Sequence, residues 1–158
     1  MNQQMSDQIR RRAEEGYVTA MVGDQLFGVA LTQVRDVFVP KGICRVPMAP
    51  PSVAGLLSLR GRVVTAIDLR RRLGLPAREA DAPCVAIGIE RGQEVYGLIA
   101  DRIGNVLRPA AESFEANPIN LASSWSEVCA GMHRLEEGVM VVLDIESLLN
   151  AEKLKEAA

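Results

Sequence analysis

Two stretches of this chain are versions of one segment. Residues 55–74 read GLLSLRGRVVTAIDLRRRLG and residues 131–150 read GMHRLEEGVMVVLDIESLLN, and the two align without a gap. The matching positions carry glycines, apolar side chains and one acid: Gly55, Leu59, Val63, Ile67, Asp68, Leu69 and Leu73 align with Gly131, Leu135, Val139, Leu143, Asp144, Ile145 and Leu149. A repeat of this kind constrains the fold more than any single motif, because equivalent sequences form equivalent local structures.

A second pair of matching segments lies upstream. Residues 23–40 read GDQLFGVALTQVRDVFVP and residues 92–109 read GQEVYGLIADRIGNVLRP. The offset is 69 residues here and 76 downstream, so the second copy is seven residues longer, and we expect a longer surface loop at 109–128. Each copy has only about 60 to 70 residues, a size whose core is marginal alone. We therefore expect two small domains in tandem that pack together and leave a seam between them.

The composition excludes several broad classes of protein. With 158 residues and 48% hydrophobic content, the chain can build one globular domain or two small ones. A net charge of -2 gives no general attraction to nucleic acid or to an anionic membrane. The charge is uneven, however. Residues 60–78 hold six arginines and one aspartate, a local charge of +5, which leaves -7 for the remainder.

The cysteines and the apolar runs indicate where the chain works. Cys44, Cys84 and Cys129 are odd in number and lack CxxC spacing, which favours buried, reduced thiols in a cytosolic protein. No apolar run approaches the roughly 18 residues that span a bilayer. The N-terminus is polar and charged rather than signal-like. We expect a cytoplasmic protein that does not insert into the membrane.

The N-terminal arm, residues 1–16, has an ambiguous pattern. Met5, Ile9 and Ala13 stand four residues apart, which permits a short amphipathic helix. The other positions are nearly all polar, and chain ends are commonly frayed. The pattern therefore favours a frayed arm over a stable helix.

Two β hairpins are predicted at equivalent places in the copies. Each consists of two β-rich runs that flank a tight turn with a glycine, and a glycine followed by any residue suits a type II′ turn. The predicted strands are 17–22 and 25–30 around Gly23-Asp24, and 85–90 and 93–99 around Arg91-Gly92. A helix-sized connector is expected after each hairpin, with Thr32 and Asp101 as its N-caps.

The downstream blocks predict a strand followed by a helical turn. The apolar runs at 63–67 and 139–143 each precede an acid, so Asp68 and Asp144 are predicted N-caps. Gly74 and Asn150 stand where a left-handed C-cap is favoured. Only the last helix, from Ile145 to about Lys155, looks longer. Many short strands with brief helical turns favour a mainly β fold of small closed barrels.

Catalytic chemistry has little support in this sequence. His133 is the only histidine and aligns with Leu57, so we interpret it as a structural or surface residue at a strand position rather than a general base. Metal-ligand spacing and phosphate-binding glycine motifs are missing, and we expect no metal and no cofactor. Asp68 and Asp144 could act as an acid–base pair, but their equivalence favours the capping role. We expect a protein that is not an enzyme.

Nucleic-acid binding is a natural alternative for a small β barrel with many arginines. Arg60, Arg62 and the run at 70–72 lie close in sequence. Single-strand binding relies on aromatic stacking, however, and this chain is 4% aromatic with Trp125 as its only tryptophan. We therefore expect no nucleic-acid partner and interpret the run at 70–72 as a solvated helix face.

The difference between the copies points to a binding surface. Folding requirements recur at equivalent positions, whereas functional positions need not. The largest reversal of charge sets Arg60-Gly61-Arg62 against the stretch at 136–138, which reads Glu-Glu-Gly. An arginine in a tight turn can make forked hydrogen bonds to a carboxylate or carbonyl of a partner. Asp36 also differs from its counterpart, which is the neutral Asn105.

The segments GLLSLRGRVVTAIDLRRRLGL, YVTAMVGDQLFGVALTQVRDVF, VYGLIADRIGNVL and MVVLDIESLLN resemble, in this order, the CheW family of chemotaxis coupling proteins. The resemblance covers about residues 17–149. It implies two packed, pseudo-symmetric SH3-like barrels of five strands each, with short connecting helices and a C-terminal helix. Residues 17–150 would form one domain of two intertwined barrels, and residues 151–158 would end the C-terminal helix and form a tail.

The function implied by the resemblance is that of a non-enzymatic adaptor. Such a protein would couple the cytoplasmic tips of chemoreceptors to the regulatory domain of the histidine kinase CheA, in arrays at the membrane. The partner-binding positions implied are Val34, Asp36, Gly55, Ser58, Arg60 and Arg62. In this reading Val34 gives apolar contact, Gly55 lets a partner backbone approach, and Asp36 and Arg60 fix orientation. The family usually has Glu at position 36 and Asn at position 58.

A free-standing barrel that binds a small molecule or nucleic acid remains the alternative from another class. Co-purification separates the two, because an adaptor retains receptor or kinase fragments and a ligand-binding module does not.

Overall fold

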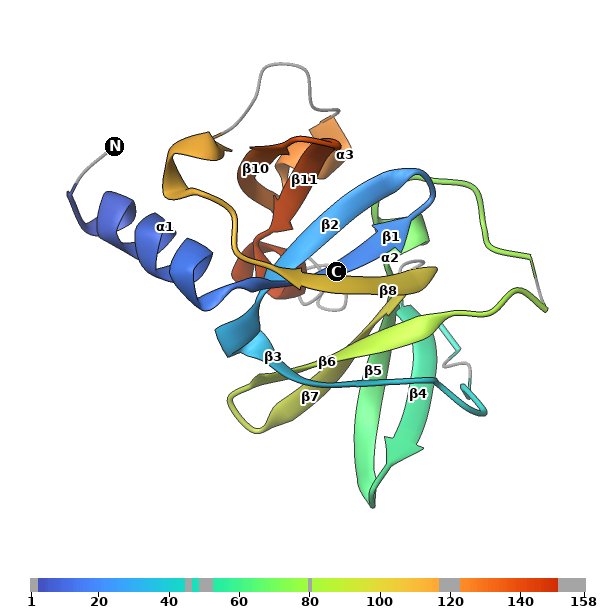
Figure 1. Ribbon diagram of the computed structural model, residues 1–158. Helices are drawn as coiled ribbons and strands as arrows, with labels where there is room; N and C mark the ends of the chain where they lie inside the picture. The colour runs from blue at the N-terminus through green and yellow to red at the C-terminus, as the bar shows by residue number, and fades with distance from the viewer. Residues whose placement is uncertain (1–2, 45–46, 49–52, 80, 117–122, 151–158) are drawn as a thin grey trace.

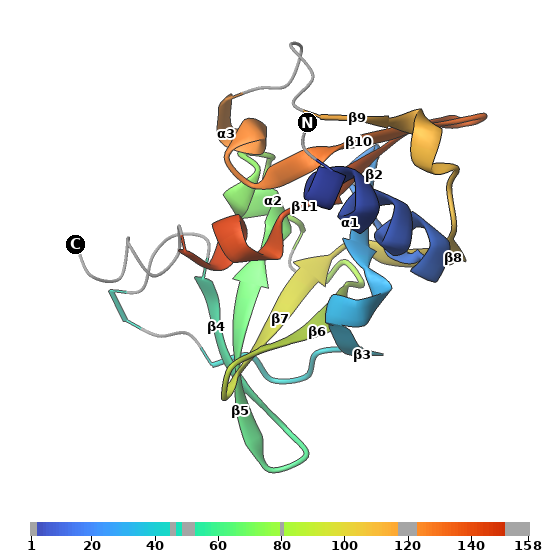
Figure 2. The same ribbon diagram turned by 90° about the vertical axis from the view of Figure 1, so that its left-hand side faces the viewer.

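The chain folds into two β sheets that lie one above the other (Figures 1 and 2). The computed structural model describes residues 3–44, 47–48, 53–79, 81–116 and 123–150. One sheet has the order β8-β1-β2-β11-β10-β9 and the other has the order β3-β6-β7-β5-β4. The strands are β1 (Tyr17–Val22), β2 (Gln25–Ala30), β3 (Val34–Phe38), β4 (Val53–Leu59), β5 (Arg62–Asp68), β6 (Val85–Arg91), β7 (Glu94–Ala100), β8 (Arg102–Leu107), β9 (Phe114–Glu115), β10 (Cys129–Leu135) and β11 (Gly138–Leu143).

The helical elements are short, apart from the one at the N-terminus. They are α1 (Gln3–Glu15), α2 (Leu69–Arg72), α3 (Ser123–Ser126) and the single 3-10 turns η1 (Leu31–Gln33) and η2 (Ala111–Ser113). A further helical segment occupies residues 145–150. The predicted loop at 109–128 thus carries η2, β9 and α3 in its described residues. The predicted C-terminal helix is present as far as residue 150, and its continuation lies outside the described residues.

Each sheet takes strands from both copies of the duplicated sequence. In the six-stranded sheet, β2 of the first copy pairs in parallel with β11 of the second, with Phe27 beside Val141. In the five-stranded sheet, β5 of the first copy pairs in parallel with β7 of the second, with Ala66 beside Gly97. The tandem copies have therefore exchanged hairpins, so the two units of the fold are intertwined. The mainly β architecture predicted from the sequence is confirmed, with β9 as a two-residue sixth strand in one sheet.

The largest hydrophobic cluster fills the seam between the sheets. Phe27 of β2 and Ile67 of β5 belong to it, and both are almost fully buried. Trp125 packs against this cluster, with its ring 5.4 Å from that of Phe27. Its indole N–H donates to the Leu73 carbonyl at 2.9 Å, which satisfies its one polar atom. The two sheets are therefore joined by a shared core rather than by a polar contact surface.

Several local predictions are confirmed. The first hairpin has the predicted strands, and Gly23 at φ 62° begins its turn. Asp68 accepts a hydrogen bond from the Arg70 amide at 3.0 Å, and Asp144 accepts one from the Ser147 amide at 3.2 Å. Gly74 ends α2 at φ 74°, and the amides of residues 74 and 75 close the turn onto the carbonyls of residues 71 and 70.

Other local predictions are wrong. The N-terminal arm is not frayed, because α1 forms and its Ala13 is buried. The second hairpin turn is Gly92-Gln93 rather than Arg91-Gly92, and Gly92 at φ 62° takes its first central position as Gly23 does in the first copy. Thr32 does not cap a helix, since it lies inside the three-residue turn η1, whose N-cap makes no side-chain hydrogen bond.

Asp101 is also not an N-cap, because the chain bends there and enters β8 directly. The three thiols differ in burial, and the prediction that all are buried is wrong: Cys129 is buried, Cys84 is partly buried and Cys44 is exposed. His133 has the expected structural place. It is fully buried between the rings of Tyr17 and Phe114, and Ser113 Oγ lies 2.8 Å from its Nδ1. Burial lowers the pKa of its imidazole.

Candidate partner-binding site

The turn between β4 and β5 places Arg60 in an unfavourable backbone conformation. Leu59 pairs with Arg62, so Arg60 and Gly61 form a two-residue turn, with φ of 52° and 79°. These angles are typical of a type I′ turn, for which Asn-Gly is the preferred sequence. An arginine in the left-handed region costs about 1 to 2 kcal/mol. The turn geometry therefore does not account for an arginine at position 60.

The equivalent turn of the second copy has no such residue. Leu135 pairs with Gly138, which matches the register of Leu59 and Arg62 in the first copy. Among the described residues, only Met48 and Arg60 have a positive φ without being glycine. The glutamates at 136 and 137 thus turn the chain without this strain. The two turns therefore differ in charge and also in backbone strain, which is present at Arg60 and absent at residues 136 and 137.

Asp36 lies beside this turn. It faces inward from the edge strand β3, and its Oδ2 is 3.9 Å from Nη1 of Arg60. The arginine side chain is 79% exposed and the aspartate side chain is 20% exposed. The acid is therefore largely buried, and the arginine lies at the surface. An ion pair this exposed and this long adds little stability. The two charges remain available to a partner.

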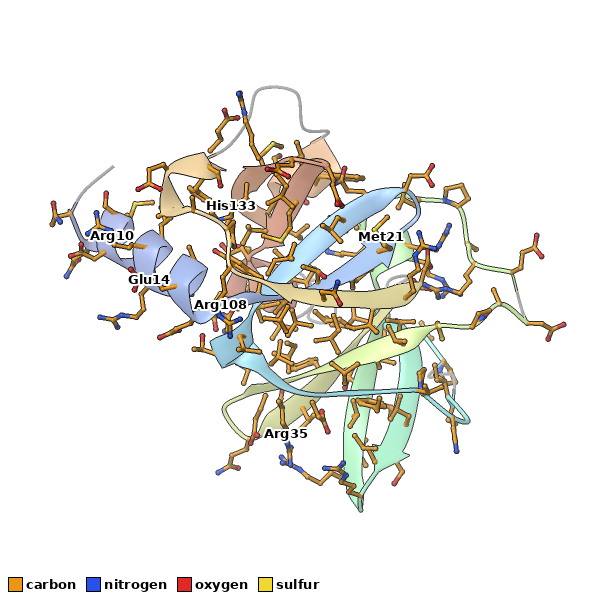
Figure 3. All side chains as sticks on the ribbon, in the orientation of Figure 1. Arg10, Glu14, Met21, Arg35, Arg108 and His133 are labelled. Carbon is orange, nitrogen blue, oxygen red and sulfur yellow. The ribbon has the colours of Figure 1, made fainter. Side chains whose placement is uncertain are left out.

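A small hollow forms around this pair at one end of the five-stranded sheet. We call it the Arg60 hollow, and its lining residues are Arg35, Asp36, Leu59, Arg60, Arg62, Val64 and Val95. Glu90 of β6 lies 3.5 Å from Arg35 and 3.7 Å from Arg62, and the Arg62 guanidinium also donates to the Gln93 carbonyl at 3.2 Å. Figure 3 shows Arg35 at this lower end of the sheet. Glu90, which the sequence analysis did not single out, restrains two of the three arginines.

The other implied positions lie outside this hollow. Val34 packs against the seam cluster and lines a second hollow, which runs from β3 to the helix at 145–150. Arg91 crosses that hollow and contacts Glu146 at 3.0 Å. Ser58 is exposed on β4 and pairs with Val63. The structure thus brings Asp36, Arg60 and Arg62 together, with Val34 two residues before Asp36 on the same strand.

Gly55 has a role within the fold that the sequence analysis missed. It is buried at φ 147°, and a Cβ at this position would overlap the carbonyl of Cys44, which pairs with β4. The counterpart Gly131 is in the same situation at φ 156°, against the backbone of Glu115. The close approach at Gly55 is therefore made by this chain's own backbone. The expectation that a partner's backbone approaches there has no support in this geometry.

We expect Gly55→Ala to lower the free energy of unfolding by about 2 kcal/mol, because the methyl group both strains the backbone and pushes against Cys44. Gly138→Ala is the matched control: Gly138 has nearly the same φ, 145°, but a Cβ there would meet nothing within 4 Å. Urea unfolding of the two variants separates strain from contact. Equal losses would show that the Cys44 contact is immaterial.

A second expected result concerns the strained turn. Arg60→Asn creates the preferred Asn-Gly turn and should raise the free energy of unfolding by about 0.5 to 1 kcal/mol. The melting temperature should rise by about 2 °C, as measured by calorimetry. A variant that is less stable than the original chain would show that Arg60 serves the fold.

Asp101 is the shared acceptor of a cluster of charged side chains, whereas the sequence predicts it as a helix cap. Arg70 donates to its two oxygens at 2.9 and 2.8 Å, Arg78 donates at 3.0 Å, and the Gly23 amide donates at 2.7 Å. Burial alone would raise the pKa of Asp101, but the hydrogen bonds from Arg70, Gly23 and Arg78 outweigh it and hold this pKa well below its ordinary value. The cluster ties the first hairpin turn to α2, which follows the end of β5 farther from the Arg60 hollow.

A sequence profile of the CheW-like domain matches residues 16–153. The chain belongs to the CheW-like domain family. The chemotaxis protein CheW of Rhizobium meliloti is 30% identical over 138 residues, which cover 87% of this chain and 88% of that protein. CheW of Klebsiella aerogenes is 28% identical over 133 residues, covering 84% and 80%.

A solved structure with the same CheW fold is that of the scaffolding protein TtCheW from Thermoanaerobacter tengcongensis. It superposes with a TM-score of 0.74 at 22% identity, over 82% of this chain and 88% of that one. This likeness confirms the fold that the sequence predicts. In the described part of the chain, no helix is both long and apolar enough to cross a bilayer, and no three His, Cys, Asp or Glu side chains gather as metal ligands.

Proposed function

We propose that this CheW-like protein is a non-enzymatic adaptor that couples chemoreceptors to the histidine kinase CheA. The match to the family runs from residue 16 to residue 153, which includes both sheets and the seam between them. Several relatives that match over most of their length are chemotaxis proteins named CheW. An adaptor with these partners would work in the cytoplasm, beside receptors held in the membrane.

One observation carries the assignment of the site, namely the strained and exposed Arg60. The backbone at this residue costs stability, and the side chain recovers little of it, because its ion pair with Asp36 is long and exposed. The duplicate turn shows that the fold does not require an arginine there. Strain that folding does not require is common at functional sites. We place the partner contact at the Arg60 hollow for this reason.

The mode of contact that fits this surface is a helical tip lying along β3. Val34 supplies an apolar contact beside the seam, and Asp36 and Arg60 lie farther along on the same side. Apolar anchors flanked by charged groups suit the helix-in-groove mode, in which the charges set orientation. Glu90 and the Gln93 carbonyl hold the Arg62 guanidinium in place. Arg62 therefore contributes positive potential to the surface rather than a hydrogen-bond donor that is free to move.

Capture by the immobilised full-length chain tests the adaptor role. A soluble receptor cytoplasmic fragment and the CheA regulatory domain are applied separately and then together. We expect each to be retained alone and both to be retained together. Retention of neither fragment would contradict the proposed function, whatever the fate of individual site residues.

A further inference from the structure

Two β bulges occupy equivalent places in the duplicated fold. In the β3–β6 pair the register shifts between Val34 and Asp36, and Asp36 lies opposite Gly88. In the β1–β8 pair the register shifts between Val18 and Ala20, so that two residues of β8, Gly104 and Asn105, lie opposite Thr19. At the 69-residue offset of the upstream repeat, Thr19 corresponds to Gly88 and Asn105 corresponds to Asp36. The two bulges can therefore be compared residue by residue.

The polar group at the two bulges comes from different strands. In the β1–β8 pair, Thr19 of β1 supplies it: its hydroxyl donates to the Asn105 carbonyl at 2.5 Å and occupies the space where a Cβ of Gly104 on β8 would lie. In the β3–β6 pair, Asp36 of β3 supplies it, and its carboxylate occupies the space where a Cβ of Gly88 on β6 would lie. The side chain and the glycine have exchanged strands.

The two arrangements differ in how well they satisfy their polar atoms. The Thr19 hydroxyl has a carbonyl partner, as buried polar groups normally do. Asp36 Oδ1 is buried and has no hydrogen-bond partner among the described residues, while Oδ2 faces Arg60. Gly88 is also not among the glycines with a positive φ, so its backbone conformation does not require glycine. Folding alone therefore explains neither the glycine at position 88 nor the Asp36 carboxylate that lies against it.

We propose that Gly88 is a positioning residue for partner binding. Its missing side chain lets the Asp36 carboxylate lie flat on β6, and this placement aims Oδ2 at the Arg60 guanidinium. Any side chain at position 88 would push the carboxylate outward, away from the orientation in which the pair meets a partner. Gly88 itself touches no partner. The proposal rests on the proposed role of Asp36 and Arg60 in partner binding.

A double-mutant cycle tests the proposal, with binding of a soluble receptor cytoplasmic fragment to the full-length chain measured by calorimetry. Gly88→Ala should weaken binding by about tenfold when Asp36 is present, a coupling within the range for residues in contact. In the Asp36→Ala background the same substitution should change binding by less than about twofold, because no carboxylate remains to be displaced. The melting temperature should stay close to the parent value in both backgrounds, since the end of one side chain has to move and the carbonyl of residue 36, 3.3 Å from the new Cβ, has to shift only slightly.

Gly97→Ala is the matched control. Gly97 pairs directly with Gly88 on the neighbouring strand, but a Cβ there would make only ordinary contacts, the nearest at 3.4 Å from Val64. It should leave binding unchanged. Equal weakening by Gly88→Ala in both backgrounds would overturn the proposal, as would no weakening with Asp36 present. Full binding by Asp36→Ala alone would remove Asp36 from the site and end this inference, whereas the adaptor role would still stand if the original chain captures both partners.

Discussion

We expect Arg60→Glu to weaken binding of the receptor fragment by about 10- to 100-fold, which corresponds to the loss of one charged hydrogen bond worth about 1.5 to 3 kcal/mol. The substitution gives this turn the residue of its duplicate and removes the forked donor. It also sets a second negative charge beside Asp36, whose Oδ2 now lies 3.9 Å from the guanidinium. The fold should persist, because Arg60 is 79% exposed.

Arg102→Glu is the control for this result. It makes the same change of charge on β8, an exposed edge strand of the other sheet. Long-range electrostatics would weaken binding equally in both variants, and this shared effect should shrink as salt is raised. We expect the Arg60 variant alone to lose affinity at 0.3 M salt. Equal affinities of the two variants would move the partner site away from the Arg60 hollow.

The second large effect is expected at Asp101. Asp101→Ala removes the acceptor shared by Arg70, Arg78 and the Gly23 amide, and it leaves two partly buried guanidinium groups without their carboxylate. Stability should fall by about 3 kcal/mol, since breaking a largely buried charge pair from one side is costly. For a domain of this size the melting temperature should drop by about 6 to 12 °C. Asp81→Ala, at an exposed acid of the neighbouring loop, should leave it unchanged.

The same cluster sets an acid dependence. The pKa of Asp101 is lower in the folded chain than its ordinary value near 4. Its contribution to stability is therefore complete above about pH 4 and is lost as the pH falls through the folded-state pKa. Urea unfolding between pH 5 and pH 2.5 should show a steeper loss of stability for the original chain than for Asp101→Asn. Parallel curves would show that the cluster does not hold this carboxylate ionised.

The structural roles that the sequence predicts correctly depend on neighbours along the chain. Asp68 caps the helix that starts at the next residue, and Gly74 ends that helix with a positive φ. Both roles involve atoms within a few residues, so a short window of sequence contains the necessary information. The duplication strengthens such assignments, because it presents each requirement twice.

The roles that were misread depend on contacts between distant segments. Helix α1 has a weak amphipathic pattern, and it is ordered because Ala13 is buried against the rest of the fold. Asp101 has the chemistry of an N-cap, but Arg70 and Arg78, more than twenty residues away, bind its carboxylate instead. The exchange of hairpins between sheets likewise has no local signature in the sequence.

The candidate site divides in the same way. Arg60 could be found from sequence, because comparison of the copies shows where charge is not shared. The same comparison gives Gly55 a folding role, because its counterpart Gly131 is also glycine and also packs against the chain's own backbone. Glu90 and Gly88 gave no sequence signal, since their importance lies in contacts across β3, β5 and β6.

Receptor control of the kinase tests the central claim most directly. CheA autophosphorylation is measured with a receptor fragment assembled on vesicles, in the presence of this chain, of its Arg60→Glu variant, or of neither. We expect full receptor-dependent activation with the original chain, weak activation with the variant, which retains its fold, and none when neither is present. Equal kinase activity with and without the chain would contradict the adaptor role.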